Sequence, residues 1–182
     1  MIRFFDILLS WFGLVFTLPI FILICILGYF DTGFPVFRQQ RVGRHKKPFI
    51  LLKFRTMRID TADVASHLAS RSSITRLGHF LRRSKLDELP QLWNVLVGDM
   101  SLVGPRPCLF SQDELINERD KRGVYLVRPG ITGLAQINDV DMSDPVKLAE
   151  MDARMIQQWS LLDYFRFILA TITGKGSGDR VR

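Results

Sequence analysis

The sequence predicts a mixed α/β (α+β) fold with a small sheet, several amphipathic helices and an apolar N-terminal helix. Three observations lead to this prediction. Ile7 to Phe30 contains no charged residue, whereas the rest of the 182-residue chain mixes polar and apolar residues. Two short β-type runs flank a basic turn, and several later segments repeat apolar residues at helical spacing. We therefore expect a membrane helix over residues 1–32 and a globular domain over residues 33–182.

The charge-free segment is long enough to cross a bilayer. Its 24 residues extend about 36 Å as a straight helix, and a hydrocarbon core is about 30 Å thick. A cleaved signal peptide is disfavoured, because no small-residue cleavage site follows Gly28. Positive charge is in excess after the segment, which places that flank in the cytoplasm. The basic residues are Arg3 before it and Arg38, Arg41, Arg44, Lys46 and Lys47 after it.

Pro19 lies near the middle of this segment and predicts a kink, because proline lacks the N–H that would bond to the Val15 carbonyl. In lipid that carbonyl needs another partner, and Thr17 is close enough in sequence to be one. A kinked helix can span the bilayer, or it can bend and return to the same face. Composition leaves both topologies open.

The globular part is expected to begin with a β-hairpin. Val36–Val42 and Phe49–Met57 resemble short strands on either side of the basic turn 43–47. The later part of Thr61–Arg83 is expected to form a basic amphipathic helix. Such a helix can lie on an anionic membrane surface or pack on its own domain, and the sequence leaves both open.

Three more helices are predicted towards the C-terminus. Apolar residues recur at helical spacing over Leu89–Leu96, and Gly98 is expected to end that helix. After a loop over 129–133, Pro145 is expected to open a helix that runs to about Gln158. The last apolar stripe, Leu161 to Ile172, belongs either to the core or to a membrane interface.

The chain carries a net charge of +7, which indicates a polyanionic partner such as nucleic acid, an anionic membrane or phosphorylated substrates. No familiar nucleic-acid-binding signature is present, so nucleic acid is not expected as a partner. The two cysteines and the three scattered histidines, His45, His67 and His79, predict neither a disulfide framework nor a zinc site.

Two adjacent carboxylates, Asp87 and Glu88, precede Pro90. Because proline is tolerated only in the first turn of a helix, a helix is expected to start between Asp87 and Leu89. The N–H groups and the dipole at such a start favour anions, including phosphate. The alternative is a plain helix cap, which stabilises a helix by about 1 kcal/mol.

Several basic residues favour the phosphate interpretation. Lys53 and Arg55 fall on the second predicted strand, Arg106 lies between two prolines, and Arg128 precedes a Pro-Gly turn. Arginines held by prolines lose little entropy on binding phosphate. With the adjacent carboxylates they predict phosphoryl chemistry with a divalent metal. The sequence contains neither a Walker A nor a dinucleotide-binding glycine motif.

Four motifs, in this order and spacing, resemble those of the bacterial sugar transferases of the monotopic phosphoglycosyl transferase superfamily. The resemblance covers nearly the whole chain, and its length resembles that of the minimal members. The motifs are Lys53–Met57 (KFRTM), Leu86–Leu96 (LDELPQLWNVL), Gly98–Pro107 (GDMSLVGPRP) and Val127–Gly133 (VRPGITG).

The resemblance implies transfer of a sugar-1-phosphate from a UDP-sugar to polyprenyl (undecaprenyl) phosphate, with release of UMP. Asp87 would be the nucleophile that forms an aspartyl phosphosugar, and Glu88 a metal ligand or proton acceptor. Mg²⁺, with Mn²⁺ as the alternative, would be held by Asp87 and Glu88. Lys53 and Arg106 match positions that hold phosphates, and Asp152 matches an acidic position in the C-terminal part.

The resemblance also implies an N-terminal helix that is re-entrant and breaks at Pro19. The protein would lie in the bacterial inner (cytoplasmic) membrane with its catalytic domain on the cytoplasmic face. It would take the first membrane step of glycan assembly, for O-antigen, capsule, exopolysaccharide or glycoprotein, with membrane lipids and downstream glycosyltransferases as partners.

Two departures from the family pattern affect these expectations. Leu18 stands where members often place serine before the proline, so Thr17 or Ser10 would have to satisfy the freed carbonyl. Leu134 stands where many members carry tryptophan, and this change leaves the identity of the sugar open.

Two other functions fit part of the sequence. A membrane-anchored metal-dependent phosphatase or phosphotransferase would use the same residue types, but it would release phosphate from simple substrates. A non-enzymatic scaffold that binds anionic lipid explains the charge and the apolar helices. It gives no reason for the Asp87–Glu88 pair and its arginines.

Overall fold

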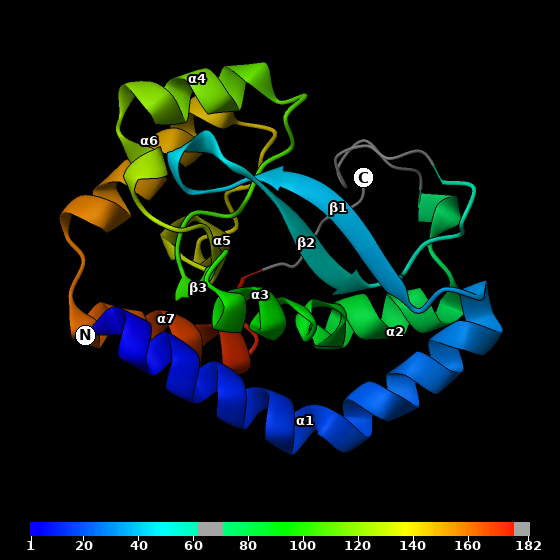
Figure 1. The fold of residues 1–182 in the computed structure, drawn as a ribbon. Helices are drawn as coiled ribbons and strands as arrows, with labels where there is room; N and C mark the ends of the chain where they lie inside the picture. The colour runs from blue at the N-terminus through cyan, green and yellow to red at the C-terminus, as the bar shows by residue number, and fades with distance from the viewer. Residues whose placement is uncertain (62–70, 177–182) are drawn as a thin grey trace.

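The computed structural model describes residues 1–61 and 71–176, and it shows a mixed α+β domain above a long N-terminal helix (Figure 1). It is 58% helical and 13% strand, which confirms the predicted class. His67 lies outside the described residues. The helices and strands are α1 (Ile2–Thr32), β1 (Val36–Val42), β2 (Pro48–Phe54), α2 (Arg76–Ser84), α3 (Gln91–Val97), β3 (Ser101–Val103), α4 (Asp113–Lys121), β4 (Gly130–Thr132), α5 (Leu134–Ile137), α6 (Pro145–Gln157) and α7 (Leu161–Ile172).

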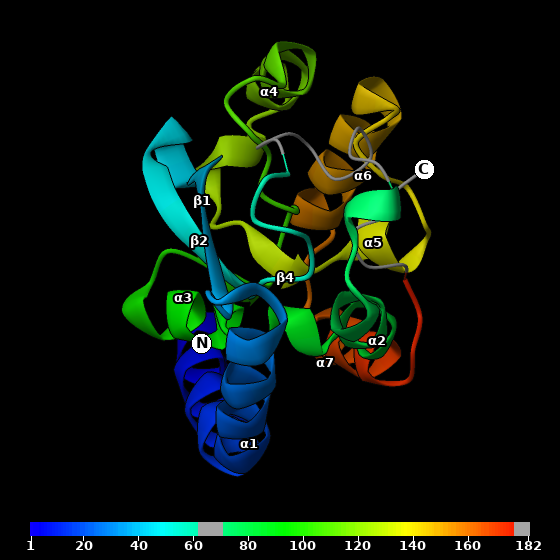
Figure 2. The same cartoon turned by 90° about the vertical axis from the view of Figure 1, so that its right-hand side faces the viewer.

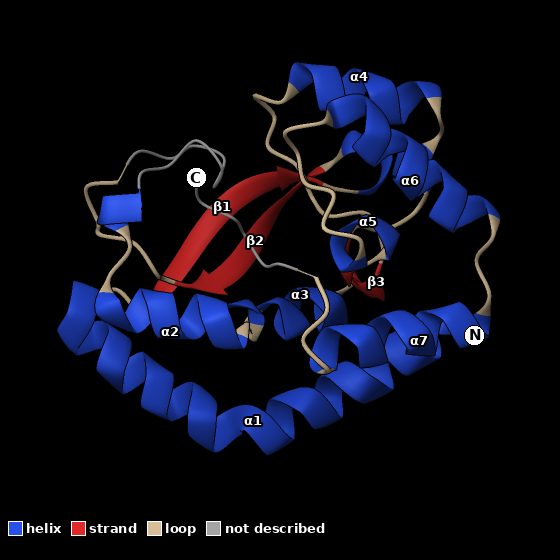
Figure 3. Ribbon diagram, turned by 180° about the vertical axis from the view of Figure 1, so that it is seen from behind, coloured by secondary structure: helices blue, strands red, loops and turns tan. Residues whose placement is uncertain are grey.

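Helix α1 is continuous but bent in its middle, so that its two arms form a shallow V beneath the domain (Figures 1 and 3). Pro19 lies inside the helix, and the predicted kink is confirmed. The expectation that Thr17 or Ser10 satisfies the freed Val15 carbonyl is wrong. The Thr17 hydroxyl donates to the Gly13 carbonyl at 2.7 Å, and the buried Ser10 hydroxyl has no hydrogen-bond partner among the described residues.

The first arm of α1, residues 2–18, is joined to the domain by polar contacts. The Arg3 guanidinium donates to the carbonyls of Val95 and Leu96 at 2.6 and 2.9 Å, at the C-terminal end of α3, where carbonyls lack helical partners. The Asp6 carboxylate is 2% exposed and accepts hydrogen bonds from the Ser101 hydroxyl and the Tyr164 hydroxyl, each at 2.9 Å. These contacts fix the arm against α3, β3 and α7.

The second arm of α1, residues 20–32, is held by apolar packing. Ile24 is buried with Phe54 of β2 and Leu81 of α2. The outward side of α1 remains bare, because only 11% of its most apolar window is buried in the protein. Among the described residues, α1 is the one helix long and apolar enough to cross a membrane. Its composition therefore indicates a membrane location.

The strands form two separate two-stranded sheets. β1 and β2 pair antiparallel from Val36 opposite Phe54 to Val42 opposite Pro48, which confirms the predicted hairpin. The second strand ends at Phe54 instead of Met57, because the chain turns away there and Met57 pairs with Ile74 in an isolated bridge.

The second sheet was not predicted. β3 and β4 are parallel, with Ser101 opposite Gly130 and Val103 opposite Thr132. Residues 129–133 were expected to form a loop, but 130–132 form β4. The close approach of the chain at Gly104 and Gly130 leaves no room for side chains, since a Cβ on Gly130 would lie 2.0 Å from the Gly104 nitrogen. This close approach brings the loop after β3 next to β4.

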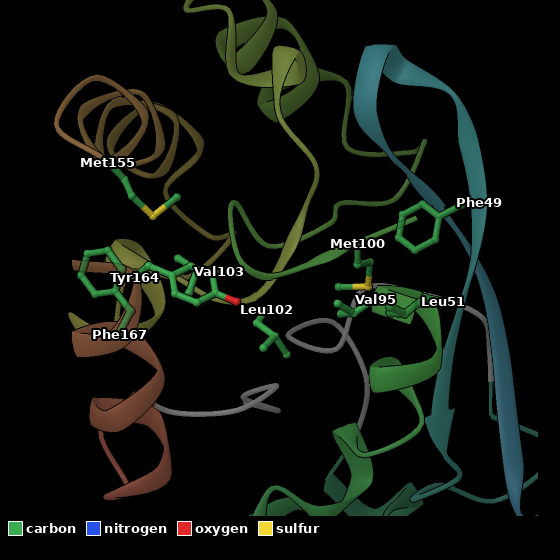
Figure 4. Close-up of a cluster of buried hydrophobic side chains, with 9 residues drawn as sticks. All are labelled: Phe49, Leu51, Val95, Met100, Leu102, Val103, Met155, Tyr164 and Phe167. Carbon is green, nitrogen blue, oxygen red and sulfur yellow. The ribbon is translucent and has the colours of Figure 1, made fainter. Parts of the chain in front are cut away.

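The largest hydrophobic cluster joins β2, α3, β3, α6 and α7 (Figure 4). In Figure 4, Met100 lies beside Val95 at one side of the cluster, Tyr164 and Phe167 of α7 lie at the other side, and Leu102 of β3 lies between them. Its buried members are Phe49, Leu51, Val95, Met100, Leu102, Val103, Met155, Tyr164 and Phe167. The cluster fixes the relative positions of β2 and of the loop after β3.

Helices α2, α3 and α7 form a layer between α1 and the remainder of the domain (Figures 1 and 2). In the basic helix α2, Thr75 caps the N-terminus by accepting from the Gly78 amide, and Leu81 is buried, so its apolar face packs on its own domain. The residues that α7 buries are not those of the predicted stripe, whose members Leu161, Leu162, Phe165, Leu169 and Ile172 are exposed. Tyr164 and Phe167 are buried in the core, whereas Leu162 is 84% exposed.

Candidate active site

Asp87 and Glu88 lie in a short 3-10 turn, η4 (Leu86–Glu88), directly before α3. The prediction that α3 starts between Asp87 and Leu89 is wrong, because α3 begins at Gln91. The physical reason is Pro90, which cannot donate an amide hydrogen to the Leu86 carbonyl. The Leu89 amide donates to that carbonyl instead, at 3.2 Å, and this i to i+3 bond defines a 3-10 turn.

Both carboxylates are largely buried, with Asp87 5% and Glu88 8% exposed. The Glu88 Oε1 accepts a hydrogen bond from the Arg106 guanidinium at 2.9 Å. The Lys53 Nζ lies 3.6 Å from the same oxygen. The structure therefore brings two of the predicted phosphate-binding residues, from β2 and from the loop after β3, to the predicted dyad. Buried charges of this kind persist only when they are paired.

A hollow of about 240 Å³ lies beside this cluster. Its wall includes Arg41, Lys53 and Arg106, together with Gln91 from the first turn of α3. Three cationic side chains around one hollow suit the binding of phosphate oxygens. The chemistry of the wall is therefore that of a polyanion site next to two carboxylates.

Arg41 and Gln91 were not predicted as site residues. Arg41 is 6% exposed and lies on the inward side of β1, two residues after the buried Gln39. Its guanidinium bonds to the Gln39 side chain and donates to the Pro107 carbonyl. An arginine in register with the buried face of a predicted strand is a signal that could have identified it.

Asp152, predicted to bind substrate, is 1% exposed and contacts Arg119, and its role at the site stays a prediction. The Asp152 Oδ2 accepts two hydrogen bonds from the Arg119 guanidinium, at 2.7 and 2.9 Å. Arg119 also donates to the Arg106 carbonyl at 2.8 Å. Burial raises the pKa of Asp152, and the neighbouring Arg119 guanidinium opposes that rise. Asp152 is therefore placed to act on the site through Arg119 and the backbone of Arg106.

Arg55 and Arg128 are not among the residues that line the hollow. The Arg55 Nε donates to the Phe34 carbonyl at 3.0 Å, and its guanidinium lies over the Phe37 ring, 5.4 Å from the centroid. The Arg128 Nε donates to the Gly98 carbonyl at 2.7 Å, at the end of α3. Their assignment to phosphate binding stays a prediction.

The residues at the dyad fit a magnesium ion that shares its ligands with a substrate. No group of three or more metal-binding side chains gathers within residues 1–61 and 71–176. Mg²⁺, however, is commonly held by one or two carboxylates and completes its shell with phosphate oxygens and water. Asp87 and Glu88 supply two carboxylates beside the cationic hollow. The Glu88 Oε1 is engaged by Arg106, which leaves the other Glu88 oxygen as the better placed of the two for the ion.

Comparisons with known proteins identify the family of the chain. The family model described as "Bacterial sugar transferase" matches residues 1–175. The chain is 39% identical over 171 residues to an uncharacterized sugar transferase, EpsL, of Bacillus subtilis, covering 93% of this chain and 84% of the relative. It is 42% identical over 151 residues to the UDP-glucose:undecaprenyl-phosphate glucose-1-phosphate transferase of Caulobacter vibrioides, covering 78% of this chain and 57% of the relative.

A third relative carries a different sugar in its name. The undecaprenyl-phosphate galactose phosphotransferase of Salmonella typhimurium is 37% identical over 190 residues, covering 93% of this chain. The chain spans 39% of that relative's length, and so corresponds to one part of a longer protein. The match of the family model extends over nearly all of this sequence. The chain therefore belongs to the bacterial sugar transferase family.

Proposed function

We propose that the protein transfers a sugar-1-phosphate from a UDP-sugar to undecaprenyl phosphate and releases UMP. The observation that carries the proposal is the buried Asp87–Glu88 pair beside a hollow lined by Arg41, Lys53 and Arg106. A diphosphate needs such cations, and a group transfer needs a nucleophile next to them. The names of the relatives from Caulobacter vibrioides and Salmonella typhimurium support the same reaction.

The transfer is proposed to take two displacements at one phosphorus atom. In the first, an Asp87 carboxylate oxygen bonds to the β-phosphorus of the UDP-sugar, and the bond from that phosphorus to the bridging oxygen breaks. UMP leaves with the bridging oxygen, and an aspartyl phosphosugar remains. In the second, an oxygen of the lipid phosphate attacks the same phosphorus and the bond to Asp87 breaks. The carboxylate is restored, and the product is a lipid diphosphosugar.

The neighbouring side chains would hold the reacting groups. Lys53, Arg41 and Arg106 would bind the phosphate oxygens, and Arg106 and Lys53 would orient Glu88. A Mg²⁺ ion held by Asp87 and Glu88 would neutralise charge on the diphosphate. The support for this ion is the chemistry of the two carboxylates.

We further propose that α1 is re-entrant, in the inner membrane, with the catalytic domain on the cytoplasmic face. Support comes from the bend at Pro19 and from the contacts of both arms with the same domain, through Arg3 and Asp6 on one arm and Ile24 on the other. A domain seated on the membrane surface would let a soluble UDP-sugar meet a lipid phosphate.

The test is UMP release from a panel of UDP-sugars with Mg²⁺, in the presence and absence of undecaprenyl phosphate. Sustained release should require the lipid and one preferred sugar, and Asp87→Asn should abolish it. Release of inorganic phosphate from simple phosphate esters, without UMP, would support a phosphatase instead. Turnover of Asp87→Asn near the parent rate would exclude Asp87 as the nucleophile.

A further inference from the structure

A second hollow, also of about 240 Å³, adjoins the dyad. It shares Arg106 and Ile131 with the first hollow and includes Glu88 in its wall. The remainder of its wall comes from segments far apart in sequence, among them Lys85 before η4 and Gln136 of α5. The two hollows therefore meet at Arg106 and Ile131. Glu88 lines only the second, and Arg41 and Lys53 line only the first.

Gln136 is the unusual member of this wall. It is 8% exposed, and neither its amide nitrogen nor its amide oxygen has a hydrogen-bond partner among the described residues. A buried polar group without a partner is costly and calls for an explanation. A carboxamide both donates and accepts, so a ligand that satisfies it must offer acceptors and donors together. Sugar hydroxyls and acetamido groups have this property.

The remainder of the wall favours a sugar over a nucleobase. Thr132 and Thr171 contribute hydroxyls that are hydrogen-bonded to each other at 2.5 Å. Lys85 contributes an ammonium group, and burial lowers its pKa. The lining drawn from the described part of the chain includes no aromatic ring on which a base could stack. Polar groups without a stacking surface suit a hydroxyl-bearing ring.

The position of the hollow agrees with this choice. In a UDP-sugar, the sugar is bonded to the β-phosphate, whereas the uracil is separated from it by the ribose and the α-phosphate. A hollow that begins at Glu88 and Arg106 therefore lies next to the phosphate proposed to react at Asp87. The group bonded to that phosphate is the one that would extend into it.

We propose that this second hollow holds the sugar of the UDP-sugar donor, and that Gln136 hydrogen-bonds to it and helps to select it. The inference rests on the proposed function and deepens it. It assigns the first hollow to the diphosphate and the second to the sugar. Glucose and galactose, the sugars in the names of two relatives, differ in the direction of a single hydroxyl, which a fixed amide can distinguish.

The test is Gln136→Met, which keeps the side-chain length and removes both hydrogen-bonding functions. With UDP-glucose, UDP-galactose and UDP-N-acetylglucosamine as donors, KM for the preferred donor should rise at least about tenfold, and the preference among donors should narrow. Inhibition by UDP, which lacks the sugar, should stay within about twofold of the parent value, because it depends on the first hollow. Gln157→Met, at the exposed end of α6, is the matched control and should change neither quantity.

A binding measurement separates this inference from the proposed reaction. In an Asp87→Asn background, calorimetry should show that Gln136→Met weakens the binding of the UDP-sugar but leaves the binding of UDP unchanged. If the parent enzyme releases no UMP from any donor, the proposed function fails, whereas selective weakening of the UDP-sugar would still support the sugar site. If the binding of UDP and of the UDP-sugar is weakened equally, the amide contacts the nucleotide and the inference is overturned. If both Gln136→Met and Gln136→Glu fail to fold, the amide has a structural role, and this result would also overturn the inference.

Discussion

At the scale of single residues, the site depends on charges that are buried in pairs. Arg119 and Asp152 are the most enclosed pair, with side chains 2% and 1% exposed. Neither lines the two hollows assigned to the substrate, but Arg119 lines a neighbouring hollow that shares Arg106 with both, and it holds the Arg106 backbone. Removing one partner of such a pair leaves the other charge buried and uncompensated.

Asp152→Asn should therefore lower the free energy of unfolding by about 3–5 kcal/mol, because Arg119 loses its counter-charge. Denaturant unfolding of the detergent-solubilised protein measures this loss. Asp120→Asn is the matched control, since Asp120 pairs with Lys46 on the surface with both side chains about half exposed. Asp120→Asn should lower the free energy of unfolding by about 0–1 kcal/mol. A loss of activity in Asp152→Asn without a loss of stability would instead favour direct contact with substrate.

Some site residues could be predicted from the sequence and others could not. Asp87, Glu88, Lys53 and Arg106 lie in recognisable motifs, and the structure gathers them. The pairing of Asp152 with Arg119 depends on the packing of α6 against α4, which leaves no local mark in the sequence. Gln136 lies shortly after the Val127–Gly133 motif. Only the structure reveals that its amide has no hydrogen-bond partner among the described residues.

At the scale of elements, sequence patterns predicted correctly those helices, strands and turns whose conformation is set by residues close in sequence. The hairpin, the Pro19 bend, the start of α6 at Pro145 and the left-handed Gly98 after α3 are set by turn and proline chemistry within a few residues. The parallel pair β3–β4 was missed because each strand has three residues, too few to show a period. Its pairing depends on contacts between distant glycines.

The topology of α1 is the main prediction at this scale. The docking of both arms predicts that a cysteine inserted after Met1 and Lys47→Cys label from the same side of the membrane, in a background where Cys25 and Cys108 are replaced. A membrane-impermeant reagent, applied to right-side-out and inverted vesicles, measures this. A cysteine at the periplasmic loop of a known spanning protein is the control for sidedness. Labelling from opposite sides would show that α1 spans the bilayer.

At the scale of the whole molecule, the fold places a polar site directly above an apolar helix. α1 exposes an apolar surface that includes Trp11, Phe16 and Leu23, while α2, α3 and α7 lie between it and the remainder of the domain (Figures 1 and 2). The dyad turn η4 connects α2 to α3 within this middle layer. Asp87 and Glu88 are therefore held in the layer that meets α1, as the proposed transfer to a lipid phosphate requires.

The covalent role of Asp87 is the central claim, and intact-mass spectrometry tests it most directly. The protein is incubated with its preferred UDP-sugar and Mg²⁺, without a lipid acceptor. The account predicts one added sugar phosphate, one equivalent of UMP, localisation of the adduct to Asp87 and its loss on addition of undecaprenyl phosphate. An adduct-free protein that nevertheless transfers the sugar phosphate, or an adduct that persists in Asp87→Asn, would contradict it.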